Sequence, residues 1–210
     1  MTYKIIGDSC LDLTEELKRD PRFQMVPLTL QVGAAQVVDD ETFDQKAFIR
    51  MVKECPECPK TACPSPEIFK EAYEAADAEA VFVITLSSHL SGSYNSAALA
   101  KQLYEEEMKE KGITSSKKIE VLDSESASAG QLEQALYIRD LCEQGLNFEE
   151  VVEKLRKFRD EMHTYFVLES LDTLRKNGRL SGLQAFSASD GRAADLWREP
   201  LLHRREESYS

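Results

Sequence analysis

The sequence predicts an α/β fold with a mostly parallel sheet and flanking helices, and two strand–loop–helix units carry this prediction. Residues 80–86 form a nearly all-apolar run, which is typical of a strand that is covered on both faces, and residues 118–124, with Ile119, Val121 and Leu122, are interpreted as a second such strand. Each run is followed by a polar loop and by a long stretch of helical periodicity, at about 94–111 and about 127–144. Parallel strands need long crossover connections of this kind, so the order of elements indicates a parallel sheet.

The remaining elements are shorter and surround these two units. Extended runs are predicted at residues 3–6, at 23–32 with a break at Pro27, at 36–38 and at 165–168. Further helices are predicted at 13–19, at 44–52, from Pro66 to about residue 76, at 147–158 and in a short segment that ends at Asn177-Gly178. The Gly33 turn between two of the extended runs predicts a hairpin-like excursion from the sheet.

Helix starts and apolar stripes support these assignments. N-terminal caps are expected at Asp12 with Glu15, at Ser65 before Pro66, and at Asn147 with Glu150. Two helices carry an apolar stripe that we expect to face the core. The stripes consist of Ala47, Phe48, Met51 and Val52 in one helix, and of Ile68, Phe69, Ala72, Tyr73 and Ala76 in the other.

Length and composition limit the possible functions. The chain has 210 residues, 42% of them hydrophobic and 30% charged, which suits one ordinary domain or two small lobes with an apolar core. Its net charge of −12 repels phosphate backbones and anionic lipids, so no nucleic-acid partner is expected. No apolar run approaches the roughly 20 residues of a membrane span, and no secretory signal is visible. With an odd number of cysteines, five, we expect a reduced, cytoplasmic protein without stable membrane insertion.

Three loops at the predicted carboxyl ends of strands are candidates for a binding site, because open α/β sheets bind ligands there. They are residues 7–10, 61–65 and 87–94. The third loop offers four serine hydroxyls, and its backbone N–H groups near Gly92 lie at the positive end of a predicted helix. These features favour an anion. A serine in this loop that only caps the helix would explain the pattern equally well.

Several motifs, in one order, resemble the DegV family over residues 3 to about 186. They are Gly7-Asp8-Ser9 with Leu11-Asp12-Leu13, Val26-Pro27-Leu28, Thr61-Ala62-Cys63-Pro64-Ser65, Leu90-Ser91-Gly92-Ser93-Tyr94, Val121-Leu122-Asp123-Ser124, and Leu174-Arg175-Lys176-Asn177-Gly178-Arg179-Leu180. The resemblance implies a fatty-acid-binding protein of two α/β lobes with the acyl chain in a tunnel between them. It also implies a carrier without enzymatic activity, metal or cofactor, which presents a long-chain fatty acid to a fatty acid kinase.

The resemblance also assigns roles to individual residues. Thr61 matches the family's carboxylate-binding threonine, and Ser91 with Gly92 matches its serine–glycine pair, so two hydroxyls and a backbone N–H would hold one carboxylate. Arg179 matches the family's Gly-Arg segment and is expected either to face the kinase or to be an ordinary surface arginine. Ala62 and Cys63 replace the serine and glutamine that are usual in the family, which predicts an altered affinity for the head group.

The resemblance predicts the domain organisation as well. Residues 1–160 are expected to form the N-terminal α/β lobe, residues 161–186 the start of the C-terminal lobe, and residues 187–210 a divergent tail. Relatives continue beyond the point where the resemblance stops. We therefore expect a truncated or frameshifted reading frame and an incomplete C-terminal lobe.

Two alternatives to the carrier function, and one candidate metal site, follow from other residues. His89 beside Ser91 is compatible with a small-molecule hydrolase, although such a site also needs an orienting carboxylate and an oxyanion site. An inactive, incompletely folded fragment is the second alternative. The spacing of Cys55, Cys58 and Cys63 is that of half a zinc knuckle, but a structural zinc ion needs four ligands, so no metal is expected.

Overall fold

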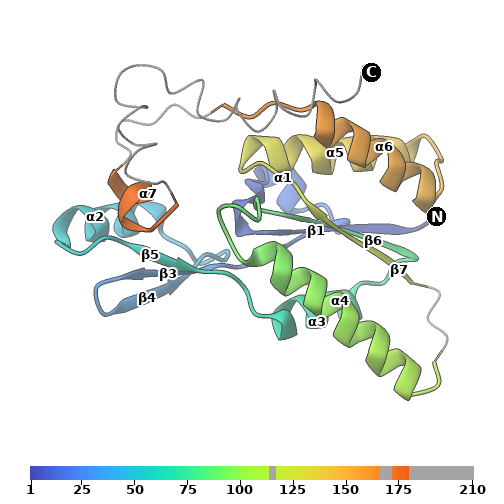
Figure 1. Ribbon diagram of the computed structural model, residues 1–210, viewed down its shortest axis with the longest axis horizontal. Coiled ribbons are helices and arrows are strands. Elements are labelled where there is room, and N and C mark those ends of the chain that lie inside the picture. Colours follow the sequence, from blue (N-terminus) through green and yellow to red (C-terminus); the bar gives the residue numbers. More distant parts are fainter. Residues whose placement is uncertain (114–116, 166–171, 180–210) are drawn as a thin grey trace, which may run out of the picture.

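A four-stranded parallel sheet forms the centre of the structure, a computed structural model that describes residues 1–113, 117–165 and 172–179 (Figure 1). The strands lie in the order β2-β1-β6-β7 and all pairs are parallel. Their bounds are Tyr3–Asp8 for β1, Phe23–Val26 for β2, Ala80–Thr85 for β6 and Lys118–Asp123 for β7. All six residues of β6 are buried. The predicted α/β class with a parallel sheet is confirmed.

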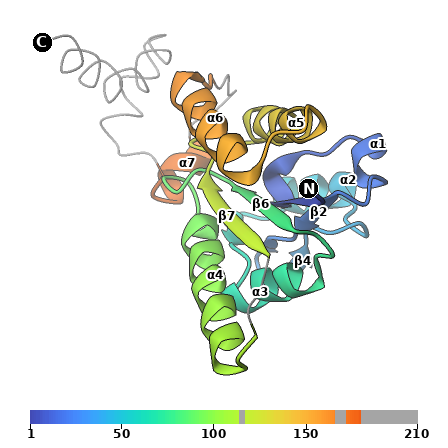
Figure 2. The same ribbon diagram turned by 90° about the vertical axis from the view of Figure 1, so that its right-hand side faces the viewer.

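Two helical layers cover the sheet (Figure 2). The helices α1 (Glu15–Lys18), α5 (Ala129–Glu143) and α6 (Phe148–Glu161) lie on one face, and α3 (Pro66–Ala75) and α4 (Ser93–Glu110) lie on the other. Successive strand residues point to opposite faces, so Ile5 packs in the first layer and Ile6 in the second. Both are fully buried, and each layer contributes its own apolar core.

Most predicted helix ends are confirmed. Asn147 and Glu150 form a reciprocal capping box at the start of α6. Gly112 and Gly145 follow α4 and α5 with φ values of 66° and 84°, which glycine adopts more easily than other residues. Pro66 stands at the first position of α3, although the Ser65 side chain makes no capping hydrogen bond.

The first helix starts later than predicted. A short 3-10 turn, Ser9–Leu11, follows β1 and buries Leu11, and Asp12 after it has a φ of 55°. A helix cannot pass through this left-handed residue, so α1 covers only Glu15–Lys18 and Thr14, not Asp12, is its cap.

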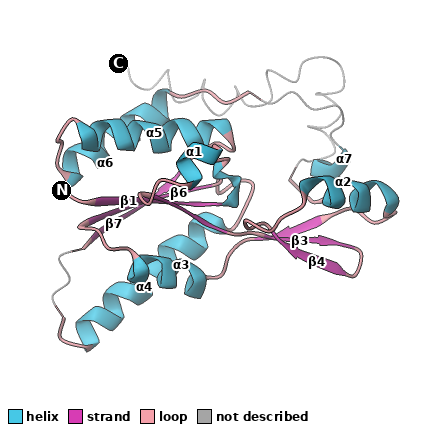
Figure 3. Ribbon diagram, turned by 180° about the vertical axis from the view of Figure 1, so that it is seen from behind, coloured by secondary structure: helices cyan, strands magenta, loops and turns pink. Residues whose placement is uncertain are grey.

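A second, antiparallel sheet lies beside the first, in the order β4-β3-β5 (Figure 3). Its strands are β3 (Thr29–Val32), β4 (Ala35–Val38) and β5 (Lys60–Ala62), and α2 (Gln45–Glu54) and α7 (Asp172–Lys176) lie near it. The predicted hairpin around Gly33 and the break at Pro27 are confirmed. The sequence did not predict β5, whose three residues are all exposed.

The structure buries most of one predicted apolar stripe and no residue of the other. In α3, Phe69, Ala72, Tyr73 and Ala76 are buried as predicted, whereas Ile68 is 42% exposed. In α2 no residue is buried, so the expectation that its stripe is core was wrong. The helix lies beside short strands and not between two layers, so little of the protein covers it. The Phe48 ring contacts Phe43, just before the helix, with 5.5 Å between the ring centroids.

The end of the described chain tests the remaining predictions only in part. The short helix before Asn177-Gly178 is confirmed as α7, and Gly178 has a φ of 71°. Tyr165 is not in a strand, and the rest of the predicted strand at 165–168 lies outside the described residues. The same holds for the predicted tail at 187–210. Among the described residues, no helix combines the length and apolarity that a membrane span needs.

Candidate functional site

Arg179 joins Thr61 to the predicted loop 87–94 at the carboxyl edge of the parallel sheet. Thr61 itself lies in strand β5 of the antiparallel sheet and not, as was predicted, in a loop. Its Nη2 donates to Thr61 Oγ1 at 2.8 Å, and its Nε donates to the Leu90 carbonyl oxygen at 2.9 Å. Thr61 is held in β5 opposite Leu30 of β3. Because the Thr61 oxygen accepts from Arg179, its own hydroxyl proton stays available for a further acceptor.

The predicted loops 61–65 and 87–94 also touch at Cys63 and Gly92. A Cβ atom added at Gly92 would lie 3.1 Å from Cys63 Sγ, which is tighter than nearly all real contacts of this kind. Cys63 Sγ also lies 3.8 Å from Ser96 Oγ on α4. The predicted site residues Thr61, Ser91 and Gly92 are therefore brought to one place, and Gly92 permits the close approach.

The serine loop turns sharply between β6 and α4. The N–H groups of Leu90 and Ser91 donate to the Ser87 carbonyl oxygen at 2.9 and 3.0 Å. Ser91 Oγ accepts from the backbone N–H of Ser93 at 3.2 Å and lies 3.0 Å from Ser93 Oγ. Ser91 therefore satisfies the backbone N–H of the first residue of α4, although Gly92 is the N-cap of this helix, and the binding of an anion by the loop stays a prediction.

A buried carboxylate, Asp8, lies beneath the serine loop. Its Oδ2 accepts from the Leu86 backbone N–H at 2.7 Å, and its Oδ1 accepts from the Cys10 N–H and from Gln131 Nε2, both at 3.2 Å. The Ser93 hydroxyl is a further partner. Burial raises the pKa of Asp8 above its usual value, and these hydrogen bonds oppose the rise.

Sequence reasoning placed Asp8 and Ser93 in two candidate loops without an individual binding role, and it did not single out Gln131. The signal that could have found them is their position. Asp8 ends β1, and the strands that follow in the sheet lie on opposite sides of it, β2 on one side and β6 on the other. Open α/β sheets bind ligands at such a switch point. All three side chains are fully buried.

The cysteines are separate thiols. All five are free, and burial together with nearby carboxylates raises the pKa of Cys10 to about 12. Cys10 is therefore a neutral thiol at physiological pH and a poor nucleophile. Among the described residues, no group of three or more metal-binding side chains occurs. Cys63 lies at Gly92, whereas Cys55 lies near Gly33 of the hairpin.

The arrangement that a hydrolase needs is not formed by Ser91 and His89. His89 is exposed, and its backbone N–H donates to Ser87 Oγ at 3.4 Å. Within the described part of the chain, the hydroxyl of Ser91 bonds to Ser93 and not to this imidazole. Nothing in this geometry prepares Ser91 as a nucleophile.

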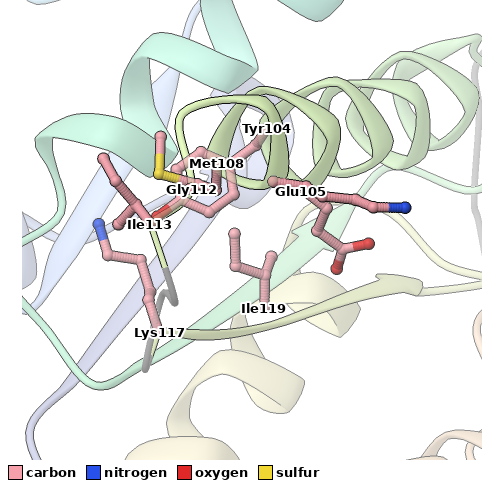
Figure 4. A pocket seen from close by; sticks show the side chains of 8 residues that line it. Tyr104, Glu105, Met108, Gly112, Ile113, Lys117 and Ile119 are labelled. Carbon is pink, nitrogen blue, oxygen red and sulfur yellow. The ribbon is translucent and has the colours of Figure 1, made fainter.

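A hollow of about 460 Å³ lies at the opposite edge of the sheet (Figure 4). It is formed where α4 ends and β7 begins, far along both elements from the serine loop. Tyr104, Met108, Ile113 and Ile119 supply apolar surface, and Lys117 is held by the Tyr73 carbonyl oxygen at 2.6 Å. This hollow is not the predicted head-group site.

Fold and site together define a class: an open α/β protein in which serine, threonine and arginine side chains gather near the carboxyl edge of its parallel sheet. Comparison with known proteins narrows the class. The model of the family described as "Uncharacterised protein, DegV family" matches residues 2–189. The chain belongs to the DegV family, as its motifs predicted.

Individual relatives agree with this assignment. A DegV domain-containing protein of Streptococcus pneumoniae is 40% identical over 186 residues, which cover 87% of this chain and 63% of that protein. A DegV-family structure from Ruminococcus gnavus with vaccenic acid is 49% identical, with a TM-score of 0.80 and coverage of 87% and 63%. The Streptococcus pneumoniae fatty acid kinase B3 protein, loaded with linoleic acid, is 39% identical, with a TM-score of 0.77 and the same coverage. The chain thus spans somewhat less than two thirds of the length of these relatives.

Proposed function

We propose that this chain binds a long-chain fatty acid whose carboxylate lies between the Thr61 loop and the Ser91-Gly92 loop. The observation that carries the proposal is the bridge from Arg179 to both loops. This bridge places the positive charge of Arg179 beside the Thr61 hydroxyl, whose proton is available to a ligand. Related structures that contain vaccenic and linoleic acid support the ligand class.

The donors at this site suit a carboxylate. A guanidinium has five N–H donors, of which Arg179 spends one on Thr61 and one on Leu90. Charge-assisted hydrogen bonds from the remaining donors are stronger than neutral ones. The acyl chain adds affinity in an apolar tunnel, at about 0.8 kcal/mol for each buried methylene group. A long chain therefore binds well even if the Ala62-Cys63 pair weakens the grip on the head group.

We infer a carrier that presents its ligand and performs no chemistry on it. Among the described residues, the Ser91 hydroxyl bonds to Ser93 and not to a base. Thr61 is exposed, so a bound carboxylate lies within reach of a partner protein. A fatty acid kinase is the partner that the family resemblance suggests. Arg179 was expected to face such a partner. Its guanidinium instead points to Thr61 and Leu90, so we assign it to the head group first and leave the partner contact as a prediction.

Native mass spectrometry of the purified full chain, followed by denaturing lipid extraction, tests the proposal. We expect a co-purifying fatty acid that is lost from the Thr61→Ala/Ser91→Ala double variant. Ser88→Ala is the matched control, since Ser88 lies in the same loop, is exposed and engages Asp123 only through its backbone N–H. This variant should keep the lipid.

Two results would contradict the proposal. A ligand that the double variant retains as well as the wild type would place the head group elsewhere. A wild-type chain that carries no lipid and takes up none on incubation would instead favour the inactive fragment. In that case a urea transition without cooperativity would complete the argument.

A further inference from the structure

A chain of three polar side chains runs from the buried core to the head-group site. Asp8 and Ser93 are fully buried, and the Ser93 hydroxyl hydrogen bonds to Asp8. Ser93 Oγ lies 3.0 Å from Ser91 Oγ, and Ser91 is partly exposed beside Gly92. The chain therefore connects a titratable group to a hydroxyl that the ligand would meet.

The number of protons fixes the direction of these hydrogen bonds. An ionised carboxylate only accepts, so Ser93 must donate its single hydroxyl proton to an ionised Asp8. The bond between the two serines must then be donated by Ser91. In this state Ser91 directs its proton inward and offers only lone pairs to the site, which a carboxylate ligand cannot use.

Protonation of Asp8 reverses every bond in the chain. A protonated carboxyl group donates one hydrogen bond and still accepts others, so the N–H groups of Leu86 and Cys10 and the amide of Gln131 keep their acceptor. Asp8 then donates to Ser93, Ser93 donates to Ser91, and Ser91 donates outward. Only this direction presents a donor to a carboxylate without breaking a bond in the chain.

The surroundings favour adding the proton at Asp8. Its hydrogen-bond partners in the described part of the chain are all neutral, and burial already raises its pKa. The other titratable or charged groups at this corner are the Cys10 thiol and the groups that act on it besides Asp8, which are Asp12, Asp39 and Arg179. Arg179 bonds to Thr61 and Leu90, so its charge stabilises the ligand directly. A ligand carboxylate adds a second negative charge at the outer end of the chain of side chains, and a like charge disfavours the ionised form of Asp8.

We propose that Asp8 is a positioning residue that couples the binding of a carboxylate to the uptake of one proton, through Ser93 and Ser91. This inference rests on the proposed fatty-acid site. It makes the affinity pH-dependent with a definite sign, because a proton that is bound with the ligand makes binding tighter as the pH falls. Above the pKa of Asp8 in the free protein, the affinity should drop about tenfold for each pH unit.

Isothermal titration calorimetry with decanoate, in buffers of different ionisation enthalpy at neutral pH, counts the protons. The slope of the observed enthalpy against the buffer's ionisation enthalpy should correspond to about one proton for the wild type. Ser93→Ala breaks the chain and should reduce the uptake to about zero, and Asp8→Asn should do the same because it cannot titrate. A thermal melt of each variant checks that it is folded.

Thr61→Ala is the matched control, since it weakens the head-group contact but leaves the chain intact. It should lower the affinity and keep the uptake of about one proton. A wild-type binding enthalpy that does not change with the buffer would overturn the inference. It would mean that no proton is taken up and that Ser91 turns its proton outward while Asp8 stays ionised. Undiminished uptake in Ser93→Ala would overturn it as well. If the wild type bound neither decanoate nor a long-chain fatty acid, the proposed function would fail, and this inference with it.

Discussion

The parallel and the antiparallel sheet bury their residues to very different degrees. In the parallel sheet every residue of β6 is buried between two helical layers. In the antiparallel sheet all three residues of β5 are exposed, and α2 beside it has no buried residue. The first region therefore has the properties of a hydrophobic core, whereas the second has those of a surface layer.

The comparison shows why the candidate site lies where the two regions meet. Asp8 and Ser93 belong to the well-packed region, which holds them in fixed positions. Thr61 belongs to the exposed strand, which leaves its hydroxyl accessible. Arg179 bonds to a residue of each region. A site of this kind combines rigid positioning from one sheet with access from the other.

Truncating one aromatic residue in each region should give the largest difference in stability between the two regions. Phe82 is fully buried and stacks on Phe148 with 5.2 Å between ring centroids, so Phe82→Ala should lower the free energy of unfolding by about 3–5 kcal/mol. Phe48→Ala in α2 should cost less than about 1.5 kcal/mol, because its ring is only partly buried. Urea unfolding measures both. Equal costs would show that the two regions are packed alike.

Alanine substitutions at one glycine of each region should differ less in their cost to stability. A Cβ atom at Gly130 would lie 1.9 Å from Ser126 Oγ, which bonds to Thr164 at 2.7 Å, so Gly130→Ala should destabilise the protein by about 1–3 kcal/mol through overpacking. At Gly33 the same Cβ would meet only Cys55 Sγ at 3.5 Å, and the φ of 56° alone should cost roughly 1–2 kcal/mol.

Adding Ser126→Ala to each glycine variant separates the two causes. In urea unfolding it should recover part of the loss in Gly130→Ala, since it removes the nearest atom. It should leave the cost of Gly33→Ala unchanged, because the backbone conformation is the cause there. Recovery of neither variant would mean that crowding by Ser126 is not what destabilises Gly130→Ala.

Sequence patterns predicted the parallel sheet because its two-sided burial requires long apolar runs. The same reasoning failed for α2, since a stripe shows which side of a helix faces inward but not how much material covers it. It also missed β5, whose three exposed residues carry no apolar pattern.

The candidate site was predictable only as separate pieces. The family motifs supplied Thr61, Ser91, Gly92 and Arg179 as candidates, but no local pattern indicates that Arg179 reaches Thr61, 118 residues earlier in the chain. The bonds of Asp8 to Leu86, Ser93 and Gln131 depend in the same way on packing between distant segments.

The smallest expected effect concerns the surface of the well-packed region. Glu107 on α4 pairs with Lys111 on its own helix and with Lys70 on α3, and these two lysines hold its pKa at about 2. A carboxylate whose pKa is lowered by folding stabilises the protein above its unfolded pKa, and this contribution is lost as the pH falls through the folded value. The difference in stability between wild type and Glu107→Gln should therefore be small at neutral pH and should shrink as the pH is lowered from about 4.5 toward 2.

Urea unfolding across this pH range, at low and at high salt, measures the effect. Lys70→Met removes the ion pair between α3 and α4, whereas Lys111→Met removes the ion pair within α4. The two variants therefore show which lysine stabilises Glu107. Salt should weaken both contributions, because the charges are exposed. A loss in Glu107→Gln as large as that in Phe82→Ala would contradict the view that this region is held together by its buried apolar layers and not by its surface charges.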